Sequence, residues 1–308
     1  MSIRKTIQLL VVALPVVLAA SVKAQSLIYV SSGGYYGNNT IGEYTDSGAT
    51  VNASLITGLN SPIGLAISGN DLFVANEGNG TVGEYDTSGN LINASLITGL
   101  NGPYFIAILG DDLFVSNTGS GNRGGYIGEY TTSGATVNAS LITGLANPQG
   151  LAISGNDLFV ANYGNNTIGE YTTSGATVNA SLIGGLVNPT GLTISGSDLF
   201  VANFGRGNIG EYTTSGATVN FYLFDADYPV GLAVSENDLF VINQGVPTSP
   251  NGSIGEYTTT GSGINASLIT GLESPLGIAV VPVPEAGAAA LLGVGGLLAI
   301  LRARRDRF

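Results

Sequence analysis

The side chains that most often carry out acid–base chemistry are scarce in this sequence, and those present are repeated. The chain has no histidine, which removes histidine-based proton transfer and histidine metal ligation together. The tetrapeptide Ile-Gly-Glu-Tyr, once Val-Gly-Glu-Tyr, supplies six carboxylates: Glu43, Glu84, Glu129, Glu170, Glu211 and Glu256. A catalytic carboxylate requires one copy that differs from the others, and these copies are alike. We therefore predict that each accepts a structural hydrogen bond from the backbone or a threonine hydroxyl.

A second repeated polar residue is the asparagine that closes the segment Asp-Leu-Phe-Val-Ala-Asn and its variants. It occurs at five places: Asn76, Asn117, Asn162, Asn203 and Asn243. Asparagine side chains bond readily to the backbone of a turn, so we predict that each caps the turn that follows it. A ring of these amides that binds a cation is the alternative hypothesis.

The charge of the chain limits its partners. From Gln25 to Glu285 it carries 20 acidic residues and two basic ones, Arg123 and Arg206, for a net charge of −18. A surface of this sign repels phosphate backbones, so we expect no nucleic acid partner. No glycine-rich phosphate loop lies between a strand and a helix, so nucleotide binding has no support either. Cations and neutral ligands such as glycans suit this surface better.

A sequence repeat carries these residues. Successive glutamates of the tetrapeptide are 41, 45, 41, 41 and 45 residues apart, and three further segments recur with them. The segments, exemplified by Pro62–Ile67, Asp71–Asn76 and Ala53–Leu59, are short, largely apolar runs bounded by hairpin-type turns. Four antiparallel strands per repeat, which we name A to D, describe one propeller blade. Because a blade packs against neighbours on both faces, we expect its strands to be apolar throughout.

The two ends of the repeat region predict how the ring closes. The region opens with a B-type strand, Leu27–Ser32, and finishes with an A-type strand, Pro275–Val280. Pairing the last strand with the first three completes a sixth blade and leaves no unpaired end. The sequence therefore predicts an all-β, six-bladed β-propeller with four-stranded antiparallel blades. The alternative, an open solenoid, calls for polar terminal caps, and here the terminal repeats are unfinished instead.

The repeat region, about 255 residues, resembles the NHL and YVTN-type propeller repeats of bacterial surface proteins. The resemblance implies the fold, whereas the function must come from the site.

A propeller presents two rims, and they differ in this sequence. The A–B and C–D turns share one rim and are nearly uniform, whereas the B–C and D–A loops share the other and vary. The variable rim is therefore the predicted binding face, with plain loop drift as the alternative explanation. Aromatic groups beside polar ones are suited to sugar or peptide ligands. The candidate residues are Tyr104, Phe105, Arg123, Tyr126, Gln149, Tyr163, Phe204, Arg206, Asp227, Tyr228, Gln244 and Glu273.

The first 24 residues read as a secretory signal peptide. Arg4 and Lys5 precede an apolar stretch, Leu9 to Ala20, and Val22-Lys23-Ala24 is a small-x-small cleavage site. A short membrane anchor is the alternative, but the apolar run is short for a membrane span. We therefore predict export and assign residues 25–282 to the propeller.

Residues 283–308 form a separate C-terminal segment. Val283-Pro284-Glu285-Ala286 leads into an apolar run that ends at Leu301, and a basic cluster follows. This pattern resembles the PEP-CTERM sorting signal of Gram-negative bacteria, although Ala286 replaces the second proline of the motif. The resemblance implies a membrane helix with a cytoplasmic basic end, an exosortase-like processing enzyme as partner, and delivery to the cell surface or extracellular matrix. A permanent single-span anchor is the alternative.

One enzyme family provides an alternative function. Glu273-Ser274-Pro275 resembles the metal-binding motif of gluconolactonase-like propellers, which implies a cation-dependent lactonase or esterase with Ca²⁺. The residues after the A-strand prolines do not match that family's further ligands, and one carboxylate does not make a divalent metal site. The residues that follow the A-strand prolines are Ile63, Tyr104, Gln149, Thr190, Val230 and Leu276. We therefore predict a non-enzymatic extracellular binding or structural protein without a cofactor, engaging a polysaccharide or a protein.

Overall fold

The computed structural model describes residues 26–34, 37–119, 124–245 and 251–282. The predicted signal peptide and sorting tail lie outside the described residues. In the segments that the structure covers, no helix combines the length and apolarity that a membrane span requires.

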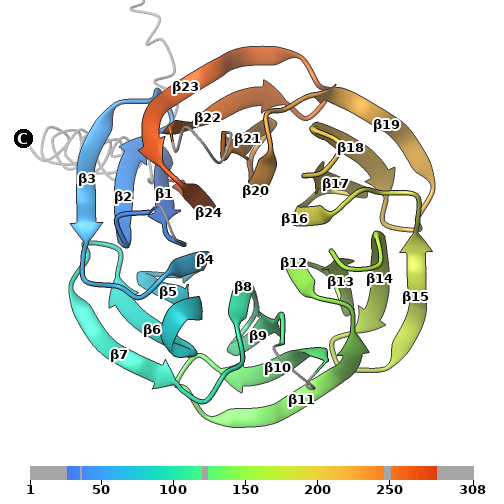
Figure 1. The fold of residues 1–308 in the computed structure, drawn as a ribbon, viewed down its shortest axis with the longest axis horizontal. Helices are drawn as coiled ribbons and strands as arrows, with labels where there is room; N and C mark the ends of the chain where they lie inside the picture. Colours follow the sequence, from blue (N-terminus) through green and yellow to red (C-terminus); the bar gives the residue numbers. More distant parts are fainter. Residues whose placement is uncertain (1–25, 35–36, 120–123, 246–250, 283–308) are drawn as a thin grey trace, which may run out of the picture. The chain divides into compact units, whose positions relative to one another are not determined.

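The described chain forms six four-stranded antiparallel sheets arranged as blades around an axis (Figure 1). Blade 1 contains β24 (Pro275–Pro282), β1 (Ser26–Ser32), β2 (Thr40–Thr45) and β3 (Thr50–Ile56). Blade 2 contains β4 (Pro62–Ser68), β5 (Asp71–Asn76), β6 (Thr81–Asp86) and β7 (Leu91–Ile97), with a 3₁₀ turn, η1 (Glu77–Asn79), after β5. Blade 3 contains β8 (Pro103–Leu109), β9 (Asp112–Asn117), β10 (Gly125–Thr131) and β11 (Thr136–Leu145).

The remaining blades repeat this order from the axis outward. Blade 4 contains β12 (Pro148–Ser154), β13 (Asp157–Asn162), β14 (Thr167–Thr172) and β15 (Thr177–Ile183). Blade 5 contains β16 (Pro189–Ser195), β17 (Asp198–Asn203), β18 (Asn208–Thr213) and β19 (Thr218–Asp225). Blade 6 contains β20 (Pro229–Ser235), β21 (Asp238–Asn243), β22 (Asn251–Thr258) and β23 (Gly263–Glu273).

Ring closure follows the prediction. β24 pairs antiparallel with β1, so the last described strand joins the first three in one sheet. The register runs from Ser26 opposite Pro282 to Ser32 opposite Pro275. The inner strands β24, β4, β8, β12, β16 and β20 then contact one another around the axis without a break. The six-bladed, closed architecture is confirmed.

The B-type strands explain why blades stack. In β13 every residue from Leu158 to Asn162 is buried, because both faces of the strand are covered. Phe159 is completely buried in a cluster with Leu199 and Val201 of the next blade. Such a cluster lies between each pair of adjacent blades and provides the apolar burial that holds the ring together.

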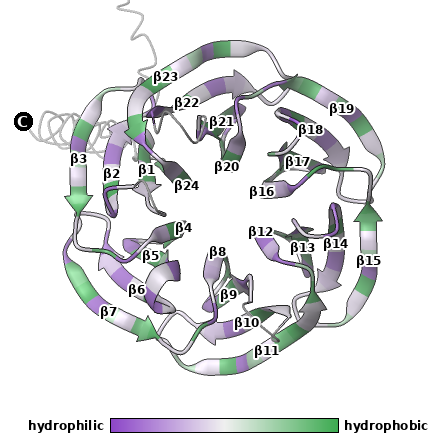
Figure 2. Ribbon diagram, viewed as in Figure 1, coloured by the Kyte–Doolittle hydropathy of each residue, from purple (hydrophilic) through white to green (hydrophobic). Residues whose placement is uncertain are grey.

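The outer strands correct one expectation. Strands of the D type are not apolar throughout: the first five residues of β3, β7, β11, β15 and β23 are exposed. Val51 and Val178, for example, are 53% and 54% exposed. Figure 2 shows hydrophobic residues along these outermost strands, at the perimeter. The outer strand of a blade has no strand beyond it, so only its last residues, such as Ile56, are packed.

The tyrosine of each Ile-Gly-Glu-Tyr segment predicts an alkaline limit to stability. Burial raises the pKa of all six from the ordinary 10.0, for Tyr130 and Tyr212 to about 12. Above pH 10 the unfolded chain gives up phenolic protons that the folded chain keeps. The stabilisation is therefore complete below pH 10 and is lost as the pH rises towards 12.

A pH series of thermal melts tests this expectation. The melting temperature should be nearly constant from pH 8 to about 9.5 and fall steeply above about 10, together with the 295 nm absorbance change of ionised tyrosine. Tyrosines that ionise near pH 10 while the fold persists would contradict the assignment.

Candidate functional site

Each inner strand begins with an irregularity that aims one side chain at the axis. In β12 the pairing with β13 shifts between Pro148 and Leu151, so Gln149 and Gly150 bulge out of the ladder. The other five inner strands shift at the same place. A bulge re-aims side chains locally. In five of the six blades the residue after the proline is thereby placed at the mouth of the central channel, on the rim of the B–C and D–A loops, whereas Ile63 is buried in an apolar cluster.

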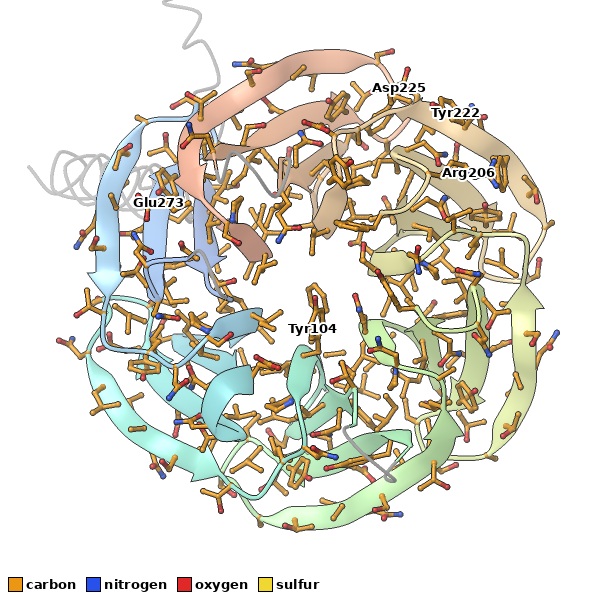
Figure 3. The ribbon with its side chains drawn as sticks, in the orientation of Figure 1. Tyr104, Arg206, Tyr222, Asp225 and Glu273 are labelled. Carbon is orange, nitrogen blue, oxygen red and sulfur yellow. The ribbon has the colours of Figure 1, made fainter. Side chains whose placement is uncertain are left out.

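These residues line an axial cavity of about 240 Å³. The cavity combines bulge residues with loop residues that follow the B-type strands. Its lining is Tyr104, Asn147, Gln149, Tyr163, Thr190, Phe204, Val230, Gln244 and Leu276. Figure 3 shows Tyr104 pointing from the start of β8 into the centre of the ring. Among the residues that the structure describes, the lining holds three aromatic rings and three carboxamides but no carboxylate and no basic group, so this part of its surface is neutral.

Two side-chain oxygens at this cavity lack protein partners. Asn147 Oδ1 and Gln149 Oε1 are buried and accept no hydrogen bond within the described part of the chain. Gln149 as a whole is only 6% exposed. A buried acceptor without a donor costs about 1–3 kcal/mol, which a ligand hydroxyl or a bound water offsets. The cavity is therefore equipped to receive hydrogen-bond donors.

The aromatic groups at the axis are fixed by packing. Tyr104, Phe105 and Phe204 pack on the apolar cluster that includes Val230 and Leu276. The rings of Tyr104 and Phe105 lie 5.5 Å apart at 59°. Burial, and then the negative charge of Glu77, raises the pKa of the Tyr104 phenol, so it remains a neutral hydrogen-bonding group. Rigid rings beside amide groups suit the faces and hydroxyls of a sugar.

Five of the predicted site residues meet at this cavity: Tyr104, Gln149, Tyr163, Phe204 and Gln244. Phe105 lies deeper, in the 350 Å³ channel that all six inner strands line. Tyr228 packs its ring against Phe204 at a centroid distance of 5.3 Å.

The other candidates lie away from the axis. Asp227 and Glu273 are exposed at the D–A loops, and Glu273 uses its backbone oxygen to accept a bond from Ser32. Arg206 turns outward over the ring of Phe221. Tyr126 lines a separate cavity of about 520 Å³ beside β11, and Arg123 lies outside the described residues.

The sequence-based list missed several residues. Asn147, Thr190, Val230 and Leu276 line the axial cavity, and three of them follow the prolines of the inner strands. Because their side chains are ordinary, only the bulge geometry reveals their position. Phe221 and Tyr222 were detectable, since they replace the Ala-Ser of the other outer strands.

The structure gives the repeated asparagines a role different from the predicted one. At Asn76, Asn117 and Asn243 the side-chain oxygen reaches back to the D–A loop that leads into its own blade. Asn162 Oδ1 and Asn203 Oδ1 are buried and accept no hydrogen bond from a described residue. Asn117 Oδ1 accepts a bond from the Asn101 amide at 3.2 Å, and Asn243 Oδ1 one from Asp227 at 3.1 Å. They fasten the loop that leads into the inner strand, and so position the rim of the cavity.

The repeated glutamates also differ from expectation. Glu43 accepts a bond from the Tyr29 hydroxyl at 3.4 Å, whereas Glu84 makes no such bond with any described backbone or threonine group. Burial, followed by the charge of Asp71, raises the pKa of Glu84, and Glu129, Glu170 and Glu211 behave alike beside their own aspartates. No cluster of three or more metal-ligating acidic side chains is found among the residues that the structure covers.

Comparison with known proteins adds the fold alone. No protein family model and no curated protein sequence matches the chain. A chain of a nidogen/laminin complex superposes with a TM-score of 0.64 at 16% identity, over 83% of this chain and 98% of that one. A gluconolactonase from Xanthomonas campestris superposes with a TM-score of 0.55 at 13% identity, over 66% of this chain and 75% of that one. Both likenesses support the six-bladed propeller.

Proposed function

We propose that this chain is an exported, non-enzymatic binding propeller that engages an extracellular polysaccharide through the axial cavity. The neutral lining of aromatic rings and carboxamides, with two unpartnered acceptors, supports this proposal most strongly. Stacking on rings and donation of hydroxyl protons to amide oxygens are what a sugar supplies. The resemblance of the repeats to NHL and YVTN-type surface proteins, and of residues 283–308 to the PEP-CTERM signal, supports export and exosortase-like processing.

A protein ligand is the second possibility within this proposal. The solved complex that the fold resembles joins nidogen to laminin. The small cavity, about 240 Å³, has room for one sugar unit or one inserted side chain, so it does not distinguish these ligands by size. We favour the sugar because the unpartnered oxygens call for several donors in one small group.

A cation-dependent lactonase is the alternative function, because a gluconolactonase shares the fold. Its metal would need several oxygen ligands with negative charge at the axis. Within the described segments the axial cavity has no carboxylate in its lining, and Glu273 is exposed at the end of β23. Metal analysis of the purified protein separates the two: a stoichiometric, tightly held Ca²⁺ would favour the lactonase.

A glycan array probed with the purified full-length protein tests the binding proposal. We expect binding to a defined set of neutral glycans, weakened about tenfold by Tyr163→Ala and by Gln149→Ala, since each removes an anchor at the cavity centre. Asn156→Ala, an exposed substitution on the opposite, uniform rim, is the control and should change nothing. The assignment would be wrong if Asn156→Ala weakened glycan binding as much as the cavity variants did, or if neither cavity variant weakened it.

A further inference from the structure

Blade 5 departs from the repeat in two segments that lie side by side. Its B–C loop reads Phe204-Gly205-Arg206-Gly207 where blade 4 has Tyr163-Gly-Asn-Asn, and its outer strand carries Phe221-Tyr222 where blade 4 has Ala-Ser. The two changes meet in space, because the Arg206 guanidinium lies 4.9 Å from the centroid of the Phe221 ring. Random divergence of the B–C loop alone does not account for the aromatic ring in the outer strand that Arg206 contacts.

The changed residues continue the axial cavity outward. Phe204 lines the cavity and touches Tyr228, and Arg206 follows two residues later in the same loop. Figure 3 shows Arg206 and Tyr222 successively farther from Tyr104 at the axis. We call Phe204, Tyr228, Arg206, Phe221 and Tyr222 the blade 5 strip.

Two residues of the strip lie on a strand that is anchored by packing, and the guanidinium of the strip remains available. Phe224 stacks on Tyr257 at 4.0 Å and 11°, which anchors β19. Tyr222 is 47% exposed and donates its hydroxyl proton to Asp225. Arg206 is exposed and makes no ion pair with a described carboxylate, so its donors are free for ligand oxygens.

The backbone conformation of Tyr228 costs stability, and the contacts of its ring give a reason for a tyrosine at this position. Its φ is +52°, a left-handed conformation that a bulky residue disfavours. The corresponding residues before the other inner-strand prolines are Ser61, Gly102, Asn147, Asn188 and Ser274. These five residues are small or tolerate a left-handed conformation better than tyrosine does. Tyr228 is 37% exposed, and its ring packs on Phe204.

We propose that the ligand is a neutral polysaccharide chain that lies radially, one unit in the axial cavity and the following units along the blade 5 strip. The inference rests on the proposed function and adds the path of the polysaccharide chain over the rim and the residues that contact its further units. The cavity holds one unit, and exposed rings with a free guanidinium continue where the next units would lie. The net charge of −18 disfavours a polyanion. The few strip residues fall short of the 20–30 per partner of a standard protein interface.

Titrations with oligosaccharide ladders test the inference. The probes are gluco-, manno- and galacto-oligosaccharides of one to six units, with polygalacturonate as the acidic comparison. We expect at least one neutral ladder to bind, with affinity rising at least tenfold from two to six units. Tyr222→Ala and Arg206→Ala should remove most of this gain and leave the monosaccharide affinity unchanged, whereas Tyr163→Ala should weaken every length.

Matched variants separate contact from structure. Tyr222→Phe keeps the ring and loses only the bond to Asp225, so it should retain the long-chain gain. Tyr228→Asn should raise the melting temperature by relieving the backbone and yet weaken long ligands. Binding at the cavity with no dependence on chain length would overturn the inference and leave the proposed function standing. No binding by any neutral ladder, or preference for polygalacturonate, would also overturn it. Array binding that is unchanged by both Tyr163→Ala and Gln149→Ala would overturn the inference and the proposed function together.

Discussion

Replacing Gly277 by alanine is expected to destabilise the propeller by about 3 kcal/mol or more. A Cβ at this position would lie 1.9 Å from the backbone oxygen of Ile63 in the neighbouring blade. Backbone atoms on both sides fix this contact, so inner strands of adjacent blades must separate to make room. The contact also belongs to the ring closure, because the Gly277 amide donates to Ser31 Oγ at 2.7 Å.

Chemical denaturation with circular dichroism measures this effect, and Gly184→Ala is its matched control. Gly184 has no atom within 4 Å of an added Cβ and does not adopt a positive φ. Its substitution should change the free energy of unfolding by less than about 0.5 kcal/mol. Similar stability of the two variants would mean that the inner strands do not approach as closely as described.

The second large effect concerns the closing strand. A chain that stops at Ser274 lacks β24, which removes a complete strand pairing and exposes β1 as an edge. It also leaves Ser31, fully buried, without Gly277, and opens the apolar cluster that includes Ile28, Leu276 and Ile278. Losing the two buried aliphatic side chains Leu276 and Ile278, at roughly 1.5–3 kcal/mol each, together with a whole strand pairing removes a large part of the about 5–15 kcal/mol that stabilises a typical domain. We expect this chain to aggregate or to unfold without cooperativity.

A chain that stops at Val283 is the control for this truncation. It removes the predicted sorting tail but keeps β24. Its thermal unfolding should remain a single cooperative transition, and it should elute as a compact species in size-exclusion chromatography. If both truncated chains melt alike, the seam between β24 and β1 does not carry the closure.

The architecture was accessible from the sequence because the signals that define it are local and repeated. The same strand and turn segments recur in the sequence of every blade. A repeat region that begins with a B-type strand and ends with an A-type strand therefore implies the closing sheet. Only some of the residues that line the axial cavity could be predicted from the sequence. Tyr104 and Gln149 were distinguishable because the bulge leaves their position free of repeat constraints, whereas Thr190 and Val230 carry no chemical signal and are placed only by strand register.

Two errors have physical causes. The asparagines at the ends of the B-type strands were assigned to the following turn, because sequence proximity favours local bonds. Tertiary packing instead brings the D–A loop of the same blade within reach, as in the bond from Asn101 to Asn117. The packing of a blade against neighbours on both faces predicts outer strands that are apolar throughout, yet no neighbouring strand covers Val51 and its equivalents.

Amide hydrogen exchange with and without the best-bound neutral hexasaccharide tests the account most directly, because it shows which of the two rims the ligand protects. Added protection should be confined to the axial end of β12, to the loops that begin with Tyr163 and Phe204, and to the outer half of β19. Protection at the Ser-Gly-Asn-Asp and Thr-Thr-Ser-Gly turns of the opposite rim, with none at the cavity, would contradict it.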